Sequence, residues 1–238
     1  MPLQTIEPQR LYRQIAEQLR SLISAGEFAV GSRLPAEREL ATQLGVSRPS
    51  VREALIALEV EHVIEVRTGS GIYVLQPQAR RPARKKTSAA VEWGPLELMR
   101  ARELVESEVA ALAARNAKKA DLQSIALALQ HMRDQVAKGL VPRDGDEAFH
   151  NAIAQACGND VLRDTIRGYW QARRGPLFER LGDYFEDQSS WDAALIEHAA
   201  VLEAIRAHDG SAARSAMQRH LKKAHNRYSV SWRRAKPS

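Results

Sequence analysis

The sequence predicts a mainly α-helical protein with an N-terminal winged helix-turn-helix domain and a C-terminal all-α bundle. Three observations predict this fold class. Two helical patterns with a tight turn occupy Gly31–Leu55, two short β-prone runs follow them, and strand signals are absent after Val74. The expected boundaries are 1–75 for the winged domain, 76–92 for a basic linker, 93–230 for the bundle and 231–238 for a tail.

The segment Gly31–Leu55 is expected to form two short helices that meet at Gly45, where the chain reversal often needs a positive φ. Ser47 is a suitable N-cap for the second helix, and Pro49 is tolerated in its first turn. The apolar side chains that can pack inward are Leu40, Leu44, Val46, Val51, Leu55 and Leu58. The side chains expected to stay free on the other side are Ser47, Arg48, Ser50 and Arg52.

A helix of this size fits the major groove of DNA, where arginine can form two hydrogen bonds with guanine O6 and N7. Arg48 and Arg52 lie one turn apart on the second helix, as such a contact requires. The simpler alternative is an ordinary amphipathic helix pair with a solvated basic face.

Two β-prone runs follow the helix pair, Ile64–Arg67 and Gly71–Val74, and the residues between them are a threonine, a glycine and a serine. This pattern predicts a hairpin, and a hairpin directly after a helix-turn-helix is a wing. Such a wing can place Arg67 along the phosphates or its tip in the minor groove. The hairpin therefore favours DNA binding over the simpler alternative.

The two stretches RLPAERELATQLGVSRPSVREALIALE and IEVRTGSGIYV resemble the N-terminal signature of GntR-family transcription regulators. The resemblance covers about the first third of the chain and implies double-stranded operator DNA as a partner. It assigns DNA contacts to the positions Arg38, Ser47, Arg48, Ser50, Arg52 and Gly69.

Composition agrees with a polyanionic partner, since the net charge is +6 and the isoelectric point is near 9.7. Residues 1–90 hold 13 basic and 9 acidic side chains, a net charge of +4, against +2 for the rest of the chain. Cys157 is the only cysteine, which excludes an intrachain disulfide and is typical of a reducing compartment. With no apolar run of membrane-spanning length and no signal-peptide core, the expectation is a cytoplasmic protein without a membrane partner.

Between the two domains lies QPQARRPARKKTSAAVEW, which is rich in Pro, Ala, Arg and Lys and lacks an apolar period. It is expected to be a linker. Its basic side chains are Arg80, Arg81, Arg84, Lys85 and Lys86. Contact with phosphates and a simple solvated tether remain equal alternatives for them.

The second half of the sequence shows one helical pattern after another. PLELMRARELVESEVAALAARNA has apolar side chains at helical spacing: Leu96, Met99, Leu104, Val105, Val109 and Leu112. DLQSIALALQHMRDQVAKG is expected to begin with Asp121 as N-cap and to stop at Gly139. Further helices are expected near 146–157, 160–181, 190–208 and 211–229, which makes an all-α bundle of about six helices.

Four residues in this half are candidate metal ligands: Asp146, His150, His198 and His220. Asp146 and His150 are four residues apart and therefore share one helix face. Three imidazoles and a carboxylate suit Zn²⁺, Ni²⁺ or a similar first-row ion and leave a position for water or a ligand oxygen. Because separate helices supply the ligands, spacing alone leaves open that these histidines are ordinary surface or core groups.

Three stretches resemble the FCD ligand-sensing domain of the FadR-type subgroup of GntR regulators: LELMRARELVESEVAALAA, DEAFHNAIAQACGND and EHAAVLEAIRAHDGSAARSAMQRHL. In that domain a carboxylate and three histidines bind a divalent metal, and the matching positions are the four candidates above. The resemblance spans 95–228, so the two resemblances together cover nearly the whole chain.

A metal with an open position beside a buried arginine would bind a small carboxylate, because the ion and the guanidinium both complement an anion. Arg102 matches an arginine that the family places facing the cavity, and Arg173 is a second candidate contact. The alternative for Arg102 is an intrahelical ion pair with Glu106, worth only a few tenths of a kcal/mol.

The chain looks closest to regulators of hexuronate or aldarate catabolism within this subgroup, which implies a sugar acid as effector. Other hydroxy or keto acids and amino acids remain alternatives. Our hypothesis is that the bundle forms a homodimer that sets two winged helices on a palindromic operator. A repressor released by its effector is the commoner arrangement in the family and is the expected one, and the opposite sign of response is the alternative. The competing classes are a metal-dependent enzyme, for which no general base is evident beside the ligands, and a DNA-organising protein without a sensor.

Overall fold

The computed structural model describes residues 10–67, 69–76 and 93–229. The linker arginines and lysines named above and the expected tail at 231–238 lie outside the described residues. The described residues form two compact units. None of the helices in the described ranges is both long and apolar enough to cross a membrane.

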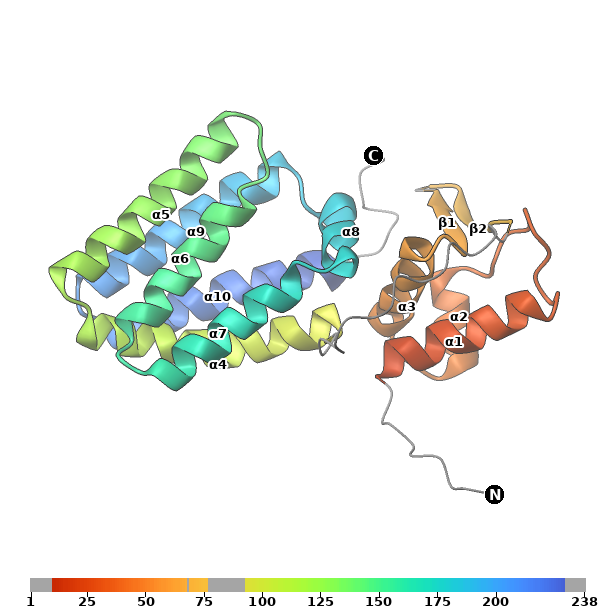
Figure 1. The fold of residues 1–238 in the computed structure, drawn as a ribbon, viewed down its shortest axis with the longest axis horizontal. Helices are drawn as coiled ribbons and strands as arrows, with labels where there is room; N and C mark the ends of the chain where they lie inside the picture. Colours follow the sequence, from red (N-terminus) through yellow and green to blue (C-terminus); the bar gives the residue numbers. More distant parts are fainter. Residues whose placement is uncertain (1–9, 68, 77–92, 230–238) are drawn as a thin grey trace, which may run out of the picture. The chain divides into compact units, whose positions relative to one another are not determined.

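The first unit contains a winged helix-turn-helix (Figure 1). Its elements are α1 (Leu11–Ser24), α2 (Glu37–Leu44), α3 (Arg48–Val60), β1 (Ile64–Arg67) and β2 (Gly71–Val74). The two strands pair antiparallel, with Ile64 opposite Val74 and Arg67 opposite Gly71. The predicted fold class of this half is therefore confirmed.

The local signals between α2 and α3 act as expected. Gly45 ends α2 with a φ of 65°, a left-handed conformation that glycine adopts without steric cost. The Ser47 side chain caps α3 by accepting the backbone N–H of Ser50 at 3.3 Å. Leu40, Val51, Leu55 and Leu58 are buried, whereas Leu44 and Val46 are only half-buried.

Seven helices follow in the described ranges, where no strand comes after β2. They are α4 (Pro95–Asn116), α5 (Lys119–Ala137), α6 (Arg143–Ala156), α7 (Asp160–Arg173), α8 (Pro176–Phe185), α9 (Gln188–Arg206) and α10 (Gly210–Ser229). α5 packs against α6 and α9, and α9 packs against α10 (Figure 1). This arrangement is the predicted all-α bundle.

Two helix boundaries and the burial of one leucine are notable in the bundle. α5 begins before Asp121, whose carboxylate instead accepts the Lys118 backbone N–H at 2.8 Å from the third helical position. The single helix expected over 160–181 is divided at Arg174 and Gly175, because a new helix starts at Pro176. Leu104, one of the apolar residues at helical spacing in α4, is 71% exposed.

The short helix α8 belongs to the first unit up to Tyr184, although it lies between two bundle helices in the sequence. The Tyr184 hydroxyl donates to the buried Glu59 carboxylate at 2.7 and 2.8 Å, and Arg180 donates to the same carboxylate at 3.1 Å. Glu59 also accepts the Val66 backbone N–H at 3.0 Å, so one buried carboxylate joins α3, β1 and α8. The sequence, including the linker predicted at 76–92, does not indicate that α8 belongs to the first unit.

Candidate metal and effector site

The four candidate ligands converge in the second unit. Asp146 and His150 lie on one face of α6, His198 lies on α9 and His220 on α10. All four are buried, with at most 5% of any residue exposed. Their candidate ligand atoms all lie within 4.8 Å of one another. Three helices far apart in the sequence thus bring together the residues that the sequence singled out.

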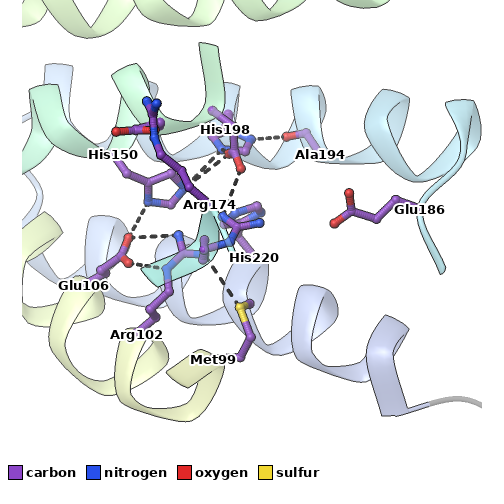
Figure 2. Close-up of polar contacts among 12 residues, drawn as sticks. Met99, Arg102, Glu106, His150, Arg174, Glu186, Ala194, His198 and His220 are labelled. Carbon is purple, nitrogen blue, oxygen red and sulfur yellow. Dashed lines mark hydrogen bonds and ion pairs between the residues drawn. The ribbon is translucent and has the colours of Figure 1, made fainter. Parts of the chain in front are cut away.

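Each histidine is held through its Nδ1 atom by a neighbouring acceptor. His198 Nδ1 donates to the Ala194 carbonyl at 2.6 Å, and His220 Nδ1 donates to the Glu197 carboxylate at 2.9 Å. His150 Nδ1 donates to the Glu106 carboxylate (Figure 2). Because a neutral imidazole carries one N–H, these contacts leave the Nε2 atoms as lone-pair acceptors.

The Nε2 atoms face other acceptors. His198 Nε2 lies 3.3 Å from His150 Nε2 and 3.0 Å from Asp146 Oδ1. Despite that short distance, the buried Asp146 Oδ1 has no hydrogen-bond partner among the described residues. Buried acceptors that face each other without a shared proton are costly unless a cation lies among them. The donor set therefore fits a divalent first-row ion.

Opposing effects act on the protonation of the cluster. Burial would raise the pKa of the Asp146 carboxyl, but contacts from His150 and His198 outweigh it and hold the pKa well below its usual value. Burial would lower the pKa of His150, but Glu106 and Asp146 outweigh it and raise this pKa. Burial, together with His198 and His150, lowers the pKa of His220 well below its usual value. The cluster thus attracts positive charge but does not hold a proton on every imidazole.

Arg102 lies on α4 and is 1% exposed. Its Nε donates to Glu106 Oε1 at 2.5 Å and its Nη2 to Glu106 Oε2 at 3.4 Å (Figure 2). The intrahelical pair with Glu106 that the sequence offered as the alternative is therefore present. It is buried beside His150 rather than solvated on the surface, and it holds the pKa of Glu106 at about 2 although burial alone would raise this value.

Arg173 also reaches the cluster, since its Nη1 donates to Asp146 Oδ2 at 3.3 Å. The guanidinium groups of Arg102 and Arg173 lie 4.5 and 4.3 Å from the centre of the Trp170 ring. The Trp170 indole N–H is buried and has no hydrogen-bond partner in the described ranges. Two cationic side chains and an unpaired N–H donor therefore lie near the candidate ligands, which suits an anion with further oxygen atoms.

Sequence reasoning missed three residues of this pocket as functional candidates: Glu106, Glu197 and Trp170. Glu106 was considered only as the ion-pair partner of Arg102, because its contact with His150 crosses 44 positions in the chain. Glu197 is adjacent to His198 in the sequence but holds His220 on the next helix. The spacing between Trp170 and Arg173 was the one available signal for the tryptophan.

In the first unit, most residues expected to contact DNA are accessible. Arg38, Ser47, Arg48 and Gly69 are exposed, and Ser50 is half-buried. Arg52 is not free as predicted, because it is 1% exposed and donates to both carboxylate oxygens of Glu37, at 2.9 and 3.0 Å. Arg48 Nε contacts the same carboxylate at 3.0 Å, so Glu37 holds both arginines.

The winged helix-turn-helix and the helical sensor-like bundle define the class of DNA-binding transcription regulators with a ligand-binding domain. Residues 11–74 match the family model "Bacterial regulatory proteins, gntR family", and residues 97–223 match the model "FCD domain". The chain belongs to the GntR family and, within it, to the FadR-type regulators that carry an FCD domain.

Two curated relatives and one solved structure illustrate the similarity. The "Exu regulon transcriptional regulator" of Escherichia coli (strain K12) is 37% identical over 92% of this chain and 84% of its own length. The "Uxu operon transcriptional regulator" of the same strain is 37% identical over 90% of this chain and 84% of its own. The structure of E. coli McbR/YncC has the same fold, with a TM-score of 0.51, 23% identity and coverage of 93% and 98% of the two chains.

Proposed function

We propose that this regulator binds a divalent metal ion, Zn²⁺ or Ni²⁺, through Asp146, His150, His198 and His220. The observation that carries this proposal is the set of buried acceptors facing one another, with Asp146 Oδ1 lacking a hydrogen-bond partner among the described residues. When bound, the ion supplies a positive charge and an open coordination position to an incoming anion. The FCD resemblance supports the same set of ligands.

The proposed effector is a small carboxylate, held by Arg102 and Arg173 beside the metal ligands. Both guanidinium groups contact the Trp170 ring, and the buried Trp170 N–H has no hydrogen-bond partner among the described residues, so these three groups are the proposed contacts of the anion. Similarity to the Exu and Uxu regulators favours a sugar acid such as a hexuronate or aldarate. Another hydroxy or keto acid, or an amino acid, is the alternative effector.

The proposed consequence is a change in operator affinity. A homodimer places two winged helices on a palindromic operator, and effector binding weakens that complex, so the protein acts as a repressor released by inducer. The effector does this only by binding more tightly to the arrangement with low operator affinity.

The family argues against a metal-dependent enzyme, since its members are transcription regulators. The sequence-adjacent glutamate was one position where a base could have been expected. Glu147, adjacent to Asp146, forms an ion pair with Arg174 at 2.7 Å and is not among the groups that converge on the candidate metal site.

Metal content and ligand-induced stabilisation test the proposal together. Protein supplemented with Zn²⁺ and then dialysed should retain a stoichiometric ion by elemental analysis, whereas Asp146→Asn and His198→Asn should not. His131→Asn is the matched control, because His131 is exposed and lies away from the cluster. A thermal-shift screen of sugar acids and short hydroxy acids, with and without chelator, should show stronger stabilisation with metal than with chelator. The proposal would be overturned if the wild type contained no metal after supplementation and dialysis, or if all variants retained as much metal as the wild type.

A further inference from the structure

Glu106 lies between the candidate anion-binding arginine and one candidate metal ligand (Figure 2). Its Oε1 accepts from Arg102 Nε at 2.5 Å, and its Oε2 accepts from both Arg102 Nη2 and His150 Nδ1. Each of the three residues is at most 2% exposed. One buried carboxylate therefore holds both a guanidinium and an imidazole, and bulk water is not available to replace either contact.

We infer that Glu106 is a positioning residue that couples binding of the effector carboxylate to binding of the metal ion. The inference rests on the proposed function and assigns the link between its two parts to a single side chain. The FCD resemblance assigns roles to the four metal ligands and to Arg102, and neither it nor the family match assigns one to Glu106.

The first half of the link is the contact with His150. A carboxylate that accepts the Nδ1 proton fixes the ring orientation and raises the electron density at Nε2, which is the atom that faces the other ligands. The stronger this hydrogen bond is, the better a metal ligand His150 becomes.

The second half is the contact with Arg102. The guanidinium donates to both Glu106 oxygens, including Oε2, which also accepts from His150, so Arg102 and His150 compete for the negative charge of Glu106. Among the described residues Arg102 Nη1 has one weak acceptor, the Met99 sulfur at 3.6 Å, so Arg102 retains capacity for another anion.

An effector carboxylate that pairs with Arg102 relieves this competition. Glu106 then interacts more strongly with His150, and metal binding becomes tighter. Because coupling between two binding sites is reciprocal, bound metal must tighten carboxylate binding by the same factor.

Glu197 offers an internal comparison. It supports the His220 ring as Glu106 supports His150, but its other partner is Lys223 at 3.0 Å, not an arginine of the anion site. Glu108, two residues after Glu106 on α4, is exposed and pairs with Arg214 at 2.6 Å. Substituting Glu197 therefore shows the effect of losing support for a ligand histidine, and substituting Glu108 shows the effect of losing a negative charge on α4. Neither substitution removes the proposed coupling.

The experiment measures two affinities in the full chain. Zn²⁺ affinity is obtained by competition with a chromophoric chelator, and D-glucuronate affinity by calorimetry on metal-free and Zn²⁺-loaded protein. Glu106→Gln should lower Zn²⁺ affinity about 10- to 100-fold. It should also increase the glucuronate affinity of the metal-free protein, because Arg102 loses its competing anion.

The other variants should change the Zn²⁺ and glucuronate affinities in different directions. Arg102→Gln should lose glucuronate binding but keep or increase Zn²⁺ affinity, since Glu106 is then shared by no other cation. Glu197→Gln should weaken Zn²⁺ binding without changing glucuronate binding to metal-free protein, and Glu108→Gln should change neither.

The inference is overturned if Glu106→Gln behaves like Glu108→Gln, or if Arg102→Gln weakens Zn²⁺ binding as much as Glu106→Gln does. Circular dichroism checks that each variant folds, and the two variants are compared with each other, because lower Zn²⁺ affinity in Glu106→Gln alone would also follow from lost support of His150. If the wild type binds neither Zn²⁺ nor glucuronate, the proposed function itself fails. If it binds both with no mutual effect, only the coupling fails.

Discussion

Glu37 restrains the two arginines expected to contact bases. Arg52 is buried against it and Arg48 shares one of its oxygens. Burial lowers the pKa of Arg52, although Glu37 opposes this effect, and the group remains a cation at any physiological pH. If these arginines read guanine as predicted, each must exchange its contact with the Glu37 carboxylate for the base edge.

Substitutions at these arginines should therefore have unequal effects on stability but similar effects on specificity. Arg48→Ala and Arg52→Ala should each lose about 1–3 kcal/mol of base discrimination. Only Arg52→Ala should also destabilise the folded protein, by roughly 1–3 kcal/mol, because it leaves the mostly buried Glu37 without its bidentate partner.

Fluorescence anisotropy with operator and random DNA, and urea denaturation, measure the two quantities. Equal losses of affinity on both DNAs would show that the arginines neutralise phosphates only and do not read bases.

For single residues, the sequence predicts which side chains have a function better than it predicts the side chains that they contact. The i, i+4 spacing of Asp146 and His150 places both on one helix face, and the family resemblance supplies His198 and His220. The burial of Arg52 was not predictable, because its partner lies 15 residues away on another helix. Local periodicity reports which face a residue occupies, not what a second helix brings to that face.

Among the helices, the fit of α6 against α5 depends on one glycine. A Cβ at Gly145 would lie 2.6 Å from Met132 Cγ and 2.8 Å from the Met132 backbone nitrogen. Because a backbone atom cannot move aside, α6 would have to shift, and it carries two of the candidate metal ligands.

Gly145→Ala should therefore destabilise the protein by about 1–3 kcal/mol and weaken Zn²⁺ binding. The matched control is Gly168→Ala in α7, where no atom lies within 4 Å of the added Cβ. That change should be neutral or stabilise by up to about 1 kcal/mol, as expected for alanine in a helix. Thermal unfolding and chelator competition give both quantities, and equal behaviour of the two variants would refute the packing argument.

Metal removal should loosen the contacts among α6, α9 and α10, since the candidate ligands come from these three helices. An ion that binds only the folded state stabilises it by about 2.7 kcal/mol at a concentration 100 times its dissociation constant. Thermal denaturation with Zn²⁺ and with EDTA should therefore give clearly separated midpoints for wild type and coincident midpoints for His198→Asn. Coincident midpoints for wild type would mean that the cluster does not hold these helices through a metal.

The sequence predicted the elements well wherever the ends carry local signals. Ser47 and Gly45 mark the turn between α2 and α3, and both strands of the wing have the predicted bounds. The break between α7 and α8 was missed because the apolar pattern continues across Gly175 and Pro176. In this case backbone chemistry, not periodicity, ends the helix.

For the molecule as a whole, the order of a DNA-binding unit and a helical bundle was predictable, because periodicity changes along the chain. The membership of α8 in the first unit was not, since Glu59 and Tyr184 lie 125 positions apart. The identity of the proposed effector is likewise outside what local patterns contain, because its proposed contacts, Arg102, Trp170 and Arg173, lie on two helices far apart in the sequence.

A metal-dependent carboxylate site that governs DNA binding is the central feature proposed for this regulator. The most direct test is the affinity of the Zn²⁺-loaded full chain for its operator, measured by anisotropy as D-glucuronate and related sugar acids are added. We expect a sugar acid to weaken operator binding in the Zn²⁺-loaded wild type, and to have no effect after chelation or in His198→Asn. Operator affinity that is the same with and without every acid, in metal-loaded and metal-free protein alike, would contradict this proposal.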